Sequence, residues 1–168
     1  MNIQIRHWQR EYLETLVQLA NNPKIAANVR DRFPQPYTKE AGIIWIESQL
    51  NKEPFSSFAI EVDGQFAGGI GVEAKEDIYR CSMELGYWLG EPYWGKGVAT
   101  VAIGQLCTYV WNAYPAVVRL YAEVFAHNTG SMRALEKNGF SLESIRKKAA
   151  IKNGVILDDY VWVTFRPE

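Results

Sequence analysis

Residues 90–100 read Gly-Glu-Pro-Tyr-Trp-Gly-Lys-Gly-Val-Ala-Thr, and the patterns on both sides of them organise the chain. A run typical of a β-strand, Met83 to Leu89, precedes them, and a run with helical spacing, Val98 to about Trp111, follows. A glycine-rich turn between a strand and a helix leaves backbone N–H groups unpaired at the positive end of the helix dipole. Such a turn binds phosphate through the main chain, so we expect a phosphate-bearing ligand here.

The N-terminal third predicts one strand followed by helices. Alternation predicts a strand over residues 3–8, and apolar side chains at helical spacing predict a helix over residues 10–21. A short second helix is expected over residues 25–29, followed by a proline-containing loop over residues 30–37. Thr38 is expected to cap a third helix that runs to about residue 50.

The remainder alternates strands with two helices. Asp63-Gly64 predicts a hairpin of strands 55–62 and 65–73, and Asn153-Gly154 predicts a hairpin of strands 141–151 and 155–165. Further elements are expected as strands over residues 79–89 and 117–125 and a helix over residues 129–137, which Asn138-Gly139 closes. This order predicts a mixed α/β layer structure with a largely antiparallel sheet.

Composition sets limits on the class of protein. The chain has 168 residues, which suits one domain, and 48% of them are hydrophobic, which is enough for a packed core. A net charge of -1 gives no basic stripe for nucleic acid, and no apolar run approaches the roughly 18–20 residues that span a bilayer. The N-terminus has no signal-peptide pattern, and the two cysteines make no disulfide framework. We therefore expect a cytoplasmic protein that contacts neither nucleic acid nor membrane.

Two well-known phosphate motifs fit the glycine turn poorly. Gly90, Gly95 and Lys96 match the P-loop pattern, but Gly97 stands where that loop needs the Ser or Thr that holds Mg²⁺. Gly95 and Gly97 also begin the dinucleotide pattern G-x-G-x-x-G, but Thr100 stands at its third glycine. The acidic residue expected about 20 positions later is missing as well.

A third motif fits better. The pyrophosphate turn of the GNAT acetyltransferases has the core [QR]-x-x-G-x-[GA], which residues 94–99 match at Gly97 and Ala99, with Trp94 at the usual Gln or Arg. Residues 128–140 resemble the second motif of the family, N-x-x-S-x-[KR]-x-x-x-x-x-G-F, and they also follow a predicted strand. The chain therefore resembles the GNAT superfamily.

The resemblance extends along essentially the whole chain. Residues 19–23, 36–38 and 84–89 are similar to the ribosomal-protein N-acetyltransferase branch of the family. It implies a single domain, residues 1–168, of the α+β class. The implied architecture is a three-layer α/β/α fold with a mixed, mostly antiparallel central sheet of about seven strands.

The resemblance also implies acetyl-CoA as the co-substrate and a primary amine as the acceptor. The residues implied to surround the pyrophosphate, mainly with backbone N–H groups, are Gly95, Lys96, Gly97, Val98, Ala99 and Thr100. Trp88 and Leu89 match the end of the central strand, whose free backbone groups would pair with the pantetheine arm and polarise the thioester carbonyl. Asn128 and Ser131 are implied to contact the cofactor. No metal is expected, because His7 and His127 have no ligand spacing.

Two residues are the candidates for proton transfer. Glu84 shares a strand face with Gly86 and Trp88, and we expect it to take the proton of the amine, directly or through water. Many family members place a tyrosine where this chain has Leu135, which leaves Ser131 or water to protonate the leaving thiolate.

Each of these residues also has an ordinary structural explanation. Glu84 could be an ion-pair partner, Asn128 a helix cap, and Lys96 a solvated surface charge. For Asn128 we favour the cofactor contact, since Thr129 could cap the helix instead. Asp158 and Asp159 could attract a cation near the acceptor, but an exposed acidic pair is usually only solvated.

These features predict an acetyl-CoA-dependent N-acetyltransferase in which a primary amine attacks directly within a ternary complex. The expected acceptor is the α-amine of a protein N-terminus, as in ribosomal-protein acetylation, and we expect it to meet the loop over residues 30–37 and the strands around Glu84 and Tyr160. A polyamine or antibiotic acetyltransferase and a non-catalytic acyl-CoA-binding module remain as alternatives. The chain is expected to be a monomer or a homodimer.

Overall fold

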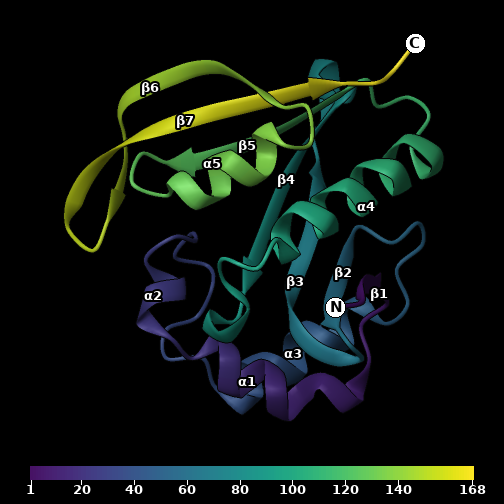
Figure 1. Cartoon of the computed structure of the whole chain (residues 1–168), viewed down its shortest axis with the longest axis vertical. Helices are drawn as coiled ribbons and strands as arrows, with labels where there is room; N and C mark the ends of the chain where they lie inside the picture. Colours follow the sequence, from purple (N-terminus) through teal and green to yellow (C-terminus); the bar gives the residue numbers. More distant parts are fainter.

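A seven-stranded sheet with the strand order β1-β2-β3-β4-β5-β7-β6 forms the centre of the computed structural model, which describes residues 1–168 (Figure 1). The strands are β1 (Ile3–Arg6), β2 (Ser57–Val62), β3 (Gln65–Ala74), β4 (Ser82–Leu89), β5 (Arg119–Phe125), β6 (Ser141–Lys152) and β7 (Val155–Phe165). Every neighbouring pair is antiparallel except β4 and β5. The predicted mixed, mostly antiparallel sheet is therefore confirmed.

Helices cover both faces of this sheet. They are α1 (Leu13–Ala20), α2 (Pro23–Ala26), α3 (Lys39–Gln49), α4 (Val98–Ala113) and α5 (Thr129–Glu136). Figure 1 shows α4 and α5 together on one side and α1 to α3 on the other. The larger core cluster holds α4 and α5 against the sheet, and a smaller, aromatic-rich cluster does the same for α1 and α3. This arrangement confirms the three-layer α/β/α fold.

Turn chemistry accounts for most of the predicted boundaries. Asp63 and Gly64 have φ values of 51° and 77°, and Asn153 and Gly154 repeat this pair of values, so both hairpins have the left-handed turn that these residues favour. Thr38 caps α3 by accepting a hydrogen bond from the backbone N–H of Ala41 at 3.1 Å. The helix and hairpin predictions at these three places are confirmed.

Several boundaries differ from the predictions, and the short second helix, expected over residues 25–29, lies at Pro23–Ala26. β1 ends at Arg6 rather than at residue 8, since Trp8 turns into the smaller core. The helix predicted from residue 10 begins as a 3-10 turn, Arg10–Tyr12. A second 3-10 turn, Asp77–Tyr79, replaces the predicted start of β4.

The sheet divides between β4 and β5. The two strands pair only from Ser82 to Glu84 with Arg119 to Tyr121. Beyond that point, residues 85–89 of β4 pair with β3 alone, while residues 122–125 of β5 pair with β7. Because both strands run in the same direction, they separate toward their C-terminal ends. The glycine turn follows directly from the free end of β4.

Candidate active site

A cavity of about 1450 Å³ lies at the division between β4 and β5. The predicted site residues that line it are Glu84, Trp88, Leu89, Gly95, Gly97, Val98, Ala99, Thr100, Asn128 and Ser131. Lys96 is exposed and does not line it. Residues separated by almost 50 positions in the sequence are thus brought to one place, although their predicted roles stay predictions.

The glycine turn presents unpaired main-chain groups to this cavity. Gly95 and Gly97 have φ values of 70° and 79°, and a Cβ on either would meet nothing within 4 Å. Gly97 is the N-cap of α4 and offers no side chain to the N–H groups of the first helical turn. These open amides at the positive end of a 16-residue helix fit a diphosphate.

Trp94, at the position where the family motif usually has Gln or Arg, makes a hydrogen bond that stabilises the turn. Its indole Nε1 donates a hydrogen bond to the carbonyl oxygen of Leu89 at 2.8 Å. This bond ties the turn to the last residue of β4. Farther along, Asn138 Nδ2 donates to the carbonyl oxygen of Thr100 at 2.9 Å, which links the start of α4 to the end of α5.

Asn128 corrects one expectation. Its side-chain oxygen accepts a hydrogen bond from the backbone N–H of Ser131 at 3.4 Å, so Asn128, rather than Thr129, caps α5. Asn128 also lines the cavity, and its Nδ2 group donates no hydrogen bond within the chain. Capping and a contact with a ligand are therefore compatible for this residue.

The α5 side of the cavity contains a tyrosine that the sequence reasoning missed. Tyr87 on β4 donates a hydrogen bond from its hydroxyl to Ser131 Oγ at 2.9 Å. Burial raises the pKa of Tyr87. Leu135, which stands at the position of the family tyrosine, is completely buried in the larger core. The alternation of β4 was the available signal, because it points Tyr87 away from Glu84 and Trp88, toward α5.

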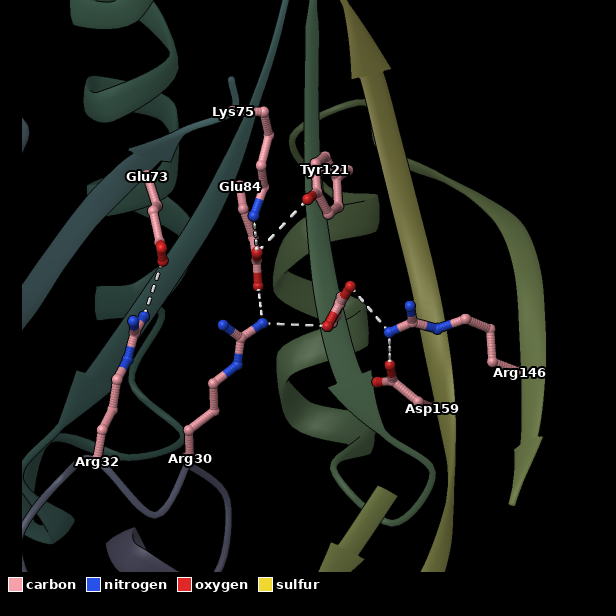
Figure 2. Close-up of polar contacts among 9 residues, drawn as sticks. Arg30, Arg32, Glu73, Lys75, Glu84, Tyr121, Arg146 and Asp159 are labelled. Carbon is pink, nitrogen blue, oxygen red and sulfur yellow. Dashed lines mark hydrogen bonds and ion pairs between the residues drawn. The ribbon is translucent and has the colours of Figure 1, made fainter. Parts of the chain in front are cut away.

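The opposite face of the sheet carries Glu84, whose side chain is only 11% exposed (Figure 2). Its Oε1 contacts Arg30, and its Oε2 lies 2.9 Å from Lys75 Nζ. The hydroxyl of Tyr121 lies 3.5 Å from Oε2. Both carboxylate oxygens are thus engaged by cations, as in the ion-pair alternative. Glu84 nevertheless stands at the last pairing between β4 and β5, where the cavity begins.

The charges continue as a chain of alternating sign across β5 to β7 (Figure 2). Arg30 Nη2 lies 3.1 Å from Glu123 Oε2, and Glu123 Oε1 lies 2.8 Å from Arg146 Nη2. Arg146 also contacts Asp159, and this pairing raises the pKa of Arg146. Asp159 is buried, contrary to the exposed pair that we expected, and its Oδ1 has no partner in the chain.

Three consecutive loop residues tie the loop before α3 to the sheet. Arg30 reaches β4 and β5, Asp31 lies 2.8 Å from Lys152 Nζ on β6, and Arg32 lies 2.8 Å from Glu73 on β3. These ion pairs hold the loop over the Glu84 side of the division. The loop predicted to meet the acceptor therefore lies at the cavity.

No group of three or more His, Cys, Asp and Glu side chains is arranged to hold a metal ion. None of the helices combines the length and the apolar character required to cross a membrane.

Comparisons with known proteins agree with this geometry. Residues 2–141 match the model of the acetyltransferase (GNAT) domain. Probable N-acetyltransferase YjcK of Bacillus subtilis is 37% identical over 102 residues, which are 59% of this chain and only 56% of that protein. L-amino acid N-acetyltransferase AaaT of Escherichia coli is 23% identical over 94% of both chains.

Solved structures share the fold. A structure of RimL, a ribosomal L7/L12 alpha-N-protein acetyltransferase in complex with coenzyme A, superposes with a TM-score of 0.85 at 20% identity, and the match covers 98% of this chain and 94% of RimL. With the family model, the turn and the divided sheet in agreement, this chain belongs to the GNAT family and is an acetyl-CoA-dependent N-acetyltransferase.

Proposed function

We propose that this enzyme acetylates the α-amine of a protein N-terminus, as ribosomal-protein acetyltransferases do. The observation that carries the proposal is the position of Glu84, at the last pairing of β4 with β5 and on the sheet face opposite Ser131. One cavity includes both residues. An amine can therefore approach from the loop side while the acyl donor lies on the α4 and α5 side.

Acetyl-CoA supplies an activated acetyl thioester when bound. The main-chain amides from Gly95 to Thr100 hold its diphosphate, and the free end of β4 at Trp88 and Leu89 aligns its arm. Asn128 Nδ2 contacts the same ligand. Ser131 faces the leaving sulfur, and Glu84 accepts the proton of the attacking amine, directly or through water.

The choice of an α-amine follows from proton energetics. An α-amine with a pKa of about 7.7–8 is partly neutral at neutral pH, whereas a lysine amine near 10.4 needs roughly 4 kcal/mol to lose its proton there. The carboxylate of Glu84 is already paired with Arg30 and Lys75. An α-amine asks less of this carboxylate than a lysine does, because part of it is neutral without help.

The charge chain argues against a polyamine acceptor. Glu84 and Glu123 are each paired with two cations, and Asp159 contacts Arg146. A polycation would meet as many positive as negative groups here. The single charge of an N-terminus needs only one carboxylate.

The same charge chain favours a second candidate, a small zwitterionic amine such as a free α-amino acid. Guanidinium groups alternate with carboxylates, so the ammonium and carboxylate of one molecule would each find a partner. AaaT, with 23% identity, acts on L-amino acids according to its name.

Thiol release from acetyl-CoA separates these acceptors. The panel contains N-terminal peptides, α-blocked lysine peptides, free amino acids, spermidine and an aminoglycoside. We expect the highest kcat/KM with peptides that have a free α-amine. Higher activity on free amino acids than on peptides would favour the second candidate, and cofactor binding without turnover on any amine would indicate a binding module.

Glu84→Gln tests the base in the same assay. We expect turnover to fall on the order of a hundredfold while the affinity for acetyl-CoA stays unchanged. Glu61→Gln is the matched control, because Glu61 is another paired carboxylate on the sheet, bonded to Tyr12 at 2.6 Å and lying outside the cavity. Unchanged turnover in Glu84→Gln would remove Glu84 from the mechanism.

The proposal places the enzyme in the cytoplasm, where nascent ribosomal proteins are found. It requires only one copy of the chain, because Glu84, Asn128, Ser131 and the glycines of the turn line one cavity. A homodimer is equally compatible with it.

A further inference from the structure

We propose that Tyr87 is a positioning residue for Ser131: its hydroxyl donates into Ser131 Oγ and thereby directs the proton of Ser131 into the cavity. This inference rests on the proposed function, in which Ser131 faces the leaving sulfur. The relevant contact is the 2.9 Å hydrogen bond between the two hydroxyl oxygens (Tyr87 Oη to Ser131 Oγ). Both residues line the cavity.

The direction of this hydrogen bond follows from the chemistry of the two groups. A phenol is far more acidic than an aliphatic alcohol, so it is the better donor, while the serine oxygen is the better acceptor. A serine hydroxyl has one proton and two lone pairs. When Tyr87 donates to one lone pair, the single proton of Ser131 remains available to another acceptor.

Ser131 does not use that proton within its own helix. Serines in helices often donate back to a carbonyl three or four residues earlier, and this would turn the proton away from the cavity. Here the Ser131 hydroxyl makes no hydrogen bond to the main chain, and its only side-chain partner is Tyr87. The backbone N–H of Ser131 is separately engaged by Asn128.

The hydrogen bond between Tyr87 and Ser131 can supply the proton that acetyl transfer requires at the sulfur. A C–N bond forms and the C–S bond breaks, so the sulfur keeps the bonding electron pair and needs one proton. Ser131 gives that proton and takes another from Tyr87, which recovers its own from the solvent. The proton released by the amine goes to Glu84 and from there to the solvent, so one proton is returned for the one withdrawn and charge and atoms balance.

Burial supports the same role. The pKa of Tyr87 is raised by desolvation, so the phenol keeps its proton through neutral and mildly alkaline pH. It therefore remains a donor over the range in which an α-amine is neutral. Leu135 on α5 has no hydroxyl group to donate a proton. Tyr87 supplies a tyrosine hydroxyl from β4 instead.

Tyr87→Phe tests the proposal because it removes only the hydroxyl. We expect kcat to fall about tenfold or more with unchanged KM for the amine and unchanged affinity for coenzyme A. A second readout is independent of turnover: the ultraviolet absorbance of the thiolate of bound coenzyme A, followed against pH. Ser131 stabilises the thiolate by donating to it, so Tyr87→Phe should move thiol ionisation to higher pH.

Two further sets of variants complete the design. Ser131→Ala should raise the pH of thiol ionisation as well, and the Tyr87→Phe/Ser131→Ala double variant should be no worse than Ser131→Ala alone, since the two residues act as a unit. Tyr109→Phe is the control, because it removes a tyrosine hydroxyl that donates to the Phe55 carbonyl at 2.7 Å, outside the cavity. It should retain wild-type kcat.

The outcomes are distinct. Wild-type kcat and wild-type thiol ionisation in Tyr87→Phe, or losses that add in the double variant, would overturn the role of Tyr87. A wild-type protein that acetylates no peptide would instead refute the proposed function, while the thiol titration would still report on Tyr87 and Ser131. A thermal melt of each variant identifies any loss of fold.

Discussion

Arg30 lies against Glu84 at the last residue of β4 that pairs with β5 (Figure 2). The same guanidinium reaches Glu123 on β5 at 3.1 Å, so one loop side chain bridges the two strands where they separate. In the proposed function, the ammonium group of the acceptor competes with this guanidinium for the two carboxylates.

Arg30→Gln should lower the KM for the amine several-fold, because the acceptor no longer displaces a guanidinium. Arg30 is 46% exposed, so the loss of unfolding free energy should be about 1 kcal/mol or less. Steady-state kinetics and urea unfolding measure both quantities. Arg10→Gln is the control, since it breaks an exposed pair with Glu47 away from the cavity. A higher KM in Arg30→Gln would mean that Arg30 holds Glu84 in its working position.

Gly97→Val should abolish binding of coenzyme A, because the added side chain would enter the space above the turn amides. The substitution also forces a β-branched residue to a φ of 79°, which costs roughly 1–2 kcal/mol by itself. Gly64→Val is the matched control, with a φ of 77° and the same open surroundings in the β2–β3 hairpin. Calorimetry should show lost binding only for Gly97→Val. Equal affinities in the two variants would count against the phosphate turn.

Gly86→Val should leave folding intact and raise the KM for the amine. Gly86 shares a face of β4 with Glu84, the proposed base, and a Cβ there would meet nothing within 4 Å. A β-branched residue also suits a strand, so stability should not fall. The side chain would take space from the acceptor. Kinetics on Gly86→Ala and Gly86→Val should show KM rising with side-chain size; no change would place the acceptor elsewhere.

The Arg32–Glu73 pair should make a small, acid-sensitive contribution to stability. A hydrogen bond from Arg32 lowers the pKa of Glu73. A carboxyl group with a lowered pKa stabilises the fold above its unfolded pKa of about 4.3, and this stabilisation is lost as pH falls through the folded value. Wild type should therefore exceed Arg32→Met at pH 7 by at most about 1 kcal/mol, since the pair is exposed. Urea unfolding from pH 7 to pH 3 should show the difference vanish; a difference that persists in acid would point to packing.

Local chemistry explains which features could be predicted. Asp63-Gly64, Asn153-Gly154, Gly95 and Gly97 adopt left-handed backbone, and the preference of these residues for it acts within a few residues. The element order and the glycine turn could therefore be predicted from the sequence. The start of β4 was not predicted, because Asp77 adopts a φ of 56° and a 3-10 turn forms at Asp77–Tyr79.

The contacts of the candidate site are of a different kind. Tyr87 and Ser131 are 44 positions apart, Arg30 and Glu84 are 54 apart, and Arg30 and Glu123 are 93 apart. Alternation along β4 assigns Glu84 and Tyr87 to opposite faces, but it does not say what each one meets. The sequence reasoning therefore proposed Glu84 and Ser131 and did not find their partners.

By itself, the amino-acid sequence determined the strand-to-helix glycine turn, the two tight hairpins and the order of the elements, because backbone preferences and hydrophobic periodicity are local properties. Only the tertiary structure decided that β4 and β5 part after Glu84, that a tyrosine reaches Ser131, and that Arg30 lies between two carboxylates. Those relationships depend on how the strands align and how the helices pack on each face, and no short segment encodes that alignment.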